Sequence, residues 1–123
     1  MDLLTAENQL AAYVANKVSL TLDQRVFSGV LPDSLPEGIE VSITECCAKD
    51  ADHFASASAR AAFYFSDRTE LENYLHTLLS ALPEWGCNGF HTIELGSHLD
   101  LSIERRREIP VYCVVVPLHL IFA

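Results

Sequence analysis

The chain is poor in basic residues. Lysine and arginine together number 8, against 17 aspartates and glutamates, so the formal net charge is −9. Binding to a nucleic-acid backbone depends on basic side chains that neutralise phosphates. The composition therefore argues against a protein whose main task is to hold nucleic acid, and we expect no sequence-specific nucleic-acid partner.

Signatures of catalysis are also scarce. Only 5 glycines are present, none in a phosphate-binding pattern, and no serine lies in a Gly-x-Ser-x-Gly context. We therefore predict no catalytic and no cofactor-binding residues, no cofactor, and a protein that is not an enzyme. A site dispersed over distant residues such as His91, Asp100 and Glu104 would leave no motif, so an enzyme of that kind stays an open alternative.

The four cysteines form no metal-binding pattern. No Cys-x-x-Cys pair occurs, and the one Cys-x3-His spacing, Cys87 with His91, has no second pair to complete a zinc site. Cys46 and Cys47 are neighbours, which rarely bond to each other, and Cys113 lies in an apolar segment where a free thiol packs as a small hydrophobe. We predict no metal and four reduced thiols.

Long apolar runs are missing. The longest, which ends at Ala123, contains Pro117 and His119 and is too short for a membrane-spanning helix. The N-terminal residues open directly into a helical pattern, without a basic segment or a cleavage site. We therefore expect a cytosolic product with no membrane partner.

Two segments carry helical periodicity. Residues 5–19 place Leu10, Val14 and Val18 on one stripe. Residues 67–82 begin with an Asp67–Glu70 pair typical of a capping box and end before a proline. Five leucines form the apolar face of this second helix, and we expect two of them, Leu75 and Leu79, to be buried.

The remaining segments alternate as strands do. We predict strands near residues 25–30, 39–44, 55–65, 98–104 and 109–122, with 90–95 as a possible additional strand. Prolines and a glycine make residues 31–38 a loop. The sequence thus predicts one α+β domain over residues 1–123: a four- to five-stranded, mostly antiparallel sheet with two helices packed on one face, in the order α-β-β-β-α-β-β.

The last strand is apolar on both faces. Two helices can cover only one face of a sheet, so either a loop or another subunit must cover the second. We consider both possibilities. If a subunit covers it, the interface is formed by one apolar face of the strand and by the arginine-rich turn before it. The residues of this hypothetical interface are Arg105, Arg106, Arg107, Tyr112, Val114, Val116 and Leu118.

The order of elements resembles the minor capsid and tail terminator (tail completion, head-tail joining) proteins of long-tailed bacteriophages. Three features carry the resemblance: an opening helix followed by the strand 26–30 and a proline-rich turn, a strand 60–65 that runs into the helix at 69–75, and an arginine-rich turn that feeds the final strand at 105–122. The resemblance covers nearly the whole chain as a pattern of architecture.

This resemblance implies a structural protein of the virion tail, made in the host cytoplasm. Such proteins form a homo-oligomeric ring, usually a hexamer, that ends the tail tube and joins tail to head. The implied partners are further copies of the chain, the tail tube protein and a head completion protein. The alternative is a small ligand-binding or regulatory α+β domain of ferredoxin-like type that oligomerises through its sheet.

Overall fold

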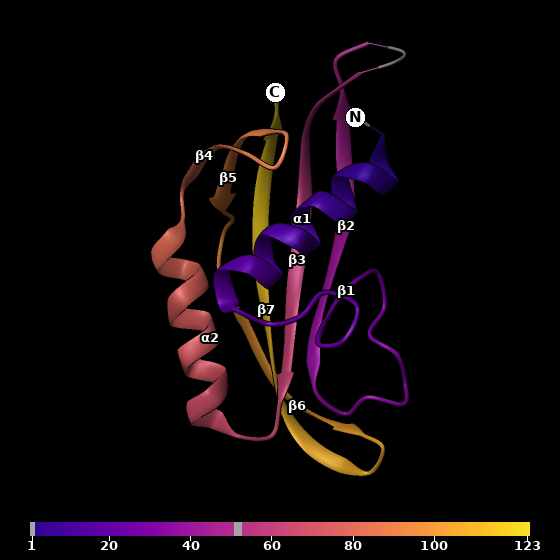
Figure 1. Ribbon diagram of the computed structural model, residues 1–123, viewed down its shortest axis with the longest axis vertical. Helices are drawn as coiled ribbons and strands as arrows, with labels where there is room; N and C mark the ends of the chain where they lie inside the picture. Colours follow the sequence, from indigo (N-terminus) through magenta and orange to yellow (C-terminus); the bar gives the residue numbers. More distant parts are fainter. Residues whose placement is uncertain (1, 51–52) are drawn as a thin grey trace.

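The computed structural model describes residues 2–50 and 53–123 and has the elements α1, β1, β2, β3, α2, β4, β5, β6 and β7 in chain order (Figure 1). Their bounds are α1 Leu3–Val18, β1 Val26–Ser28, β2 Gly38–Ala48, β3 Phe54–Phe65, α2 Arg68–Ala81, β4 Glu84–Cys87, β5 Phe90–Leu95, β6 Asp100–Arg106 and β7 Ile109–Phe122. The α+β class is confirmed, but over these described residues the sheet has seven strands rather than four or five, so the order is α-β-β-β-α-β-β-β-β rather than α-β-β-β-α-β-β.

The two helices begin at capping aspartates. Asp2 accepts a hydrogen bond from the Thr5 amide at 2.7 Å, and Asp67 accepts from the amides of Thr69 and Glu70 at 2.9 and 3.3 Å. These bonds satisfy amide groups that a helix N-terminus leaves without internal partners. The cap predicted at Asp67 is therefore confirmed, whereas α1 starts earlier than expected. Neither helix in the described ranges is long and apolar enough to span a membrane.

The sheet is built around β7, its longest strand. The strands follow the order β1-β2-β3-β7-β5-β4, and all described pairings are antiparallel except β1 with β2. β7 pairs with β3 along one edge. Along its other edge, residues 118–122 pair with β5 and residues 109–115 pair with β6. The short strand β4 was not predicted, because its Trp85-Gly86 pair is typical of a turn.

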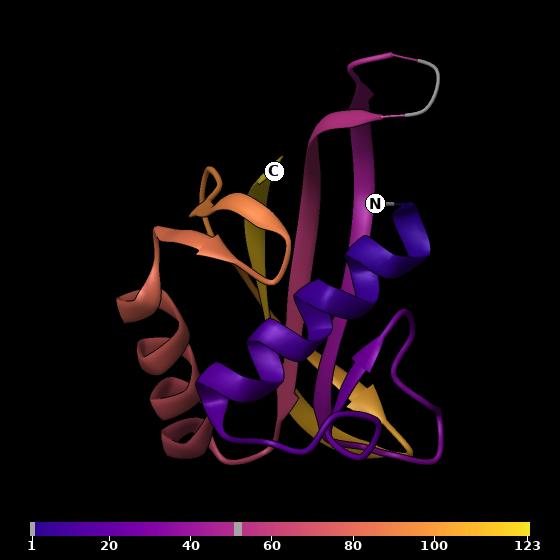
Figure 2. The same ribbon diagram turned by 45° about the horizontal axis from the view of Figure 1, so that its top comes forward.

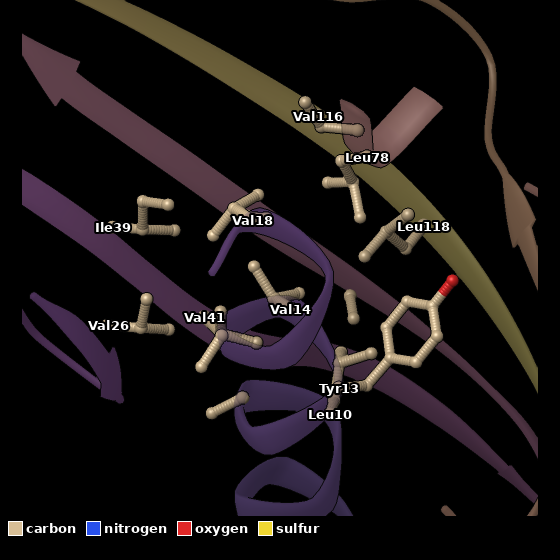
Figure 3. Packing of buried hydrophobic residues seen from close by; sticks show 14 of the residues in the cluster. Leu10, Tyr13, Val14, Val18, Val26, Ile39, Val41, Leu78, Val116 and Leu118 are labelled. Atoms are coloured by element: carbon tan, nitrogen blue, oxygen red, sulfur yellow. The ribbon is translucent and has the colours of Figure 1, made fainter. Parts of the chain in front are cut away.

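Both helices lie on the same face of this curled sheet, as predicted (Figures 1 and 2). Leu10 and Val14 of α1 pack over β2, β3 and β7, together with Leu78 of α2 (Figure 3). On β3, the alternate residues Ala57, Ala59 and Ala61 belong to this core. They pack in the same core as α1, which itself lies closest to β1 and β2.

A loop covers part of the opposite face. Residues 29–37, which we call the strap, connect β1 to β2 and place Leu31 and Leu35 against Tyr64, Val111 and Cys113. The strap is anchored by Arg106, which donates to three of its carbonyl oxygens, those of Leu31, Pro32 and Leu35, at 3.0 to 3.5 Å. For residues 111–115 of the doubly apolar last strand, the loop is therefore the cover of this face.

The leucines of α2 are buried unequally. Leu71 and Leu78 are 2% and 0% exposed, whereas Leu75 and Leu79 are only partly buried at the border of the core. The expectation that Leu75 and Leu79 would be the buried pair was therefore wrong. The helix is rotated so that Leu75 faces an open groove beside β6.

Candidate oligomerisation surface

β6 is an edge strand with an apolar face. In the described chain it pairs only with β7, so its second edge of backbone amides and carbonyls meets no other strand. Leu101 and Ile103 lie opposite Val114 and Tyr112 of β7 and therefore share the helix-bearing face of the sheet. They are 71% and 70% exposed. Large apolar side chains along an open strand edge are typical of sites where another chain pairs.

A groove separates this strand from α2. It has a volume of about 260 Å³ and is bounded by Leu71, Leu75, Leu99, Leu101, Tyr112 and Val114, with Arg68 and Glu72 at its rim. The two rim residues form an ion pair with each other, with Arg68 Nε 3.0 Å from Glu72 Oε1. Six of the eight lining side chains are apolar or aromatic, so the groove favours an apolar partner over a charged one.

A second hollow continues the groove toward the β6–β7 turn. Its volume is about 200 Å³, and its walls are formed by Ser66, Ile103, Pro110, Val111 and Tyr112. Because Tyr112 borders both hollows, they form one surface. We call it the β6–α2 surface: the apolar side chains of residues 99–103 on β6 and its approach, Tyr112 on β7, and Leu71 and Leu75 on α2.

The three arginines of the predicted interface have separate roles. Arg106 is occupied by the strap carbonyls and lies 4.9 Å from the centroid of the Tyr64 ring. Arg105 is exposed and donates to the carbonyl oxygen of Glu108 at 3.2 Å. Arg107 is exposed in the left-handed region, with φ 50°. Only Arg105 and Arg107 are therefore placed to meet a neighbouring molecule.

The four apolar members of the predicted interface are likewise divided. Tyr112 is half-buried on the β6–α2 surface, and Val114 forms its floor with 5% exposure. Val116 and Leu118 are 0% and 2% exposed and lie in the core under the helices. The hypothesis that all four face a subunit needs correction, because the face that carries them is the face that α1 and α2 cover.

The residues considered for chemistry do not converge. Asp100 and Glu104 pair with the lower part of β7 opposite Val115 and Val111, whereas His91 lies on β5 beside the end of β7 near Ile121. Val115 and Ile121 are six positions apart on β7, which is about 20 Å along a strand. His91 instead meets the Trp85 ring edge-on, at 5.9 Å between centroids. Among the described residues, no group of three or more histidine, cysteine or acidic side chains is arranged to hold a metal ion.

The cysteines lie in different environments. Cys46 and Cys47 are exposed on β2, Cys87 is half-buried, and Cys113 is buried beneath the strap. Burial raises the pKa of the Cys113 thiol, and the nearby Glu104 carboxylate raises it further. Burial likewise raises the pKa of Cys87. A raised pKa keeps a thiol protonated and unreactive, so neither cysteine has the properties of a nucleophile.

A larger hollow, of about 570 Å³, is lined by residues after β2, at the start of β3 and at the C-terminal end of β7. Its walls include Lys49, Asp50, His53 and Phe122, and His53 Nδ1 lies 2.8 Å from Asp50 Oδ1.

These features define an α+β domain whose most distinctive outward feature is an apolar strand edge suited to contact with protein. The chain matches no protein-family model, and a search of curated proteins finds no match.

Proposed function

We propose that this protein is a tail terminator, or minor capsid protein, of a long-tailed bacteriophage. Its copies form a ring, a hexamer in the favoured form, that ends the tail tube and joins the tail to the head. The observation that carries the proposal is the β6–α2 surface, where Leu101 and Ile103 remain about 70% exposed beside an open groove. A subunit that works in an assembly needs such a surface, because apolar burial supplies most of the association energy.

The charge of the chain supports the same proposal. A ring through which DNA passes must not retain it, and a formal net charge of −9 disfavours contact with phosphates. Arg105 and Arg107 lie at the end of β6, beside the apolar surface. In the proposed ring they steer an acidic neighbour into register, and their contribution falls with added salt.

The test is incubation with tail tubes assembled from tail tube protein. The wild-type chain should cap the tubes and limit their length in electron micrographs. Leu101→Asp should abolish capping, because it places a charge on the apolar edge. Leu4→Asp is the matched control: Leu4 is also a leucine, is 70% exposed, and lies at the start of α1 away from the β6–α2 surface.

A second variant tests the arginines. The double change Arg105→Glu and Arg107→Glu should slow capping, more at low salt than at high salt, while Arg106 is left to hold the strap. If the wild-type protein neither caps the tubes nor changes their length, the terminator proposal is wrong. The small ligand-binding or regulatory domain of ferredoxin-like type that oligomerises through its sheet would then be the better proposal.

A further inference from the structure

The exposed edge of β6 is self-complementary. Residues 99–103 read Leu-Asp-Leu-Ser-Ile, an alternating segment that keeps its apolar and polar positions when it is reversed about Leu101. In an antiparallel pair, residues directly opposite each other lie on the same face of the sheet. Two copies of this segment can therefore pair edge to edge with apolar side chains on one face and polar ones on the other.

One register of this antiparallel pair places compatible side chains opposite each other on both faces of the sheet. With Leu101 opposite its own copy, Leu99 lies opposite Ile103 and Asp100 opposite Ser102, and His98 meets Glu104. A pair centred on Ser102 would place Asp100 opposite Glu104, which is a repulsive contact. A pair centred on Ile103 would place Leu101 opposite Arg105. Cross-strand apolar pairs stabilise a sheet and like charges destabilise it, so the register centred on Leu101 is favoured.

The helix layer is compatible with this pairing. A two-fold axis perpendicular to the sheet keeps both copies of α2 on the same face and runs them antiparallel. The two grooves, each lined by Leu71, Leu75 and Leu99, then meet across the paired strands. Arg68 and Glu72 at the rims are of opposite charge, so antiparallel helices present complementary groups to each other.

We propose that the free protein is a two-fold dimer joined by antiparallel pairing of β6 with β6 of a second copy, with Leu101 on the axis. The open edge of β6 and its apolar side chains are then covered. The inference rests on the geometry of β6 and stands whether or not the protein is a tail terminator. If it is one, the dimer occupies the surface that the ring uses, so the dimer must open before a ring forms.

Sedimentation equilibrium tests the stoichiometry. The wild-type chain should sediment at twice its mass of 13.6 kDa. Leu101→Asp should sediment as a monomer with an unchanged circular dichroism spectrum, because Leu101 is 71% exposed in the single chain, and Leu4→Asp should remain a dimer. A monomeric wild-type protein, or a dimer that persists in Leu101→Asp, would overturn the proposal.

Cysteine crosslinking tests the symmetry. Leu101→Cys should give a disulfide between two copies under mild oxidation, located by mass spectrometry, because a residue on a two-fold axis meets itself. Leu99→Cys and Ile103→Cys should crosslink efficiently only when the two variants are mixed. Leu4→Cys, with equal exposure, is the control for random collision. Crosslinking of Leu101→Cys no stronger than that of Leu4→Cys would refute the two-fold pairing. In a ring with head-to-tail contacts, Leu101 does not meet its own copy, so Leu101→Cys would crosslink no more strongly than Leu4→Cys. The dimer proposal would then fail while the tail-terminator proposal stands, so the two proposals can fail independently.

Discussion

The guanidinium of Arg106 lies 4.9 Å from the centroid of the Tyr64 ring and points its nitrogen atoms at the strap. The Tyr64 hydroxyl in turn donates to Glu40 Oε1 at 3.2 Å, and the other carboxylate oxygen of Glu40 accepts from the Leu31 amide at 2.8 Å. Arg106 and Tyr64 therefore both hold the strap, Arg106 directly and Tyr64 through Glu40. The arginine-rich turn thus has a structural role in addition to any role in assembly.

We expect Arg106→Ala to lower the free energy of unfolding by about 1–3 kcal/mol, because several charged hydrogen bonds and one ring contact are lost. Arg106→Lys should restore little of this, since an ammonium group cannot reproduce the planar fork of donors. Arg105→Ala is the control and should stay within about 0.5 kcal/mol of the wild type. Urea unfolding followed by circular dichroism measures all three. Equal losses for Arg105→Ala and Arg106→Ala would contradict the anchor role.

Neighbouring leucines of α2 should differ in their contribution to stability. Leu78 is fully buried in the core, and Leu78→Ala should cost about 2–5 kcal/mol of unfolding free energy. Leu79→Ala removes the same atoms from a partly buried site and should cost clearly less. The pair controls for the chemistry of the substitution, because both sites lie in the same turn of one helix. A larger loss at Leu79 would mean that α2 presents a different face to the sheet.

Two glycines with positive φ should respond differently to a methyl group. At Gly38, φ is 152°, and an added Cβ would lie 2.7 Å from Leu31 Cδ1 and 2.9 Å from the Arg25 carbonyl oxygen. At Gly86, φ is 62° and no atom lies within 4 Å of the added Cβ. Gly38→Ala should therefore lower the thermal midpoint much more than Gly86→Ala, which adds only backbone strain of about 1–2 kcal/mol. Equal shifts in differential scanning calorimetry would contradict the close approach of the strap at Gly38.

The free energy of unfolding should fall at alkaline pH because of the Cys113 and Cys87 thiols. Because burial raises the pKa of Cys113 in the folded chain, the unfolded chain ionises first as the pH rises above about 8.5. The folded state then binds more protons than the unfolded state, so the free energy of unfolding decreases with pH in this window and is unaffected by this group below it. Burial raises the pKa of Cys87 as well, so it contributes with the same sign.

The measurement is urea unfolding under reducing conditions from about pH 7 to about pH 10. Cys113→Ala should flatten the alkaline decline. Cys47→Ala removes a thiol from an exposed site and serves as the matched control. A decline of the same slope in Cys113→Ala would show that the buried thiol is not its source.

Much of the fold was predictable from local pattern. The Asp67–Glu70 start of α2, the alternation of residues 55–65 and the doubly apolar segment 109–122 each reflect interactions among residues close in sequence. The predictions that were wrong concern relations between elements. The faces of the last strand could be listed from the sequence, but the face that receives the helices could not, and Val116 and Leu118 were therefore assigned to an interface although they lie in the core.

By itself the sequence determined the class of the domain, two helices with antiparallel strands, and the lack of a recognisable catalytic motif, because periodicity and spacing express these directly. Only the tertiary structure decided that the strap covers part of the second face of β7, that Arg106 anchors it, and that Leu101 and Ile103 remain exposed at an open edge. The physical reason is that burial depends on which distant segments pack together. Leu101 alternates with polar residues as a buried strand residue does, and it is exposed because no described strand pairs beyond β6.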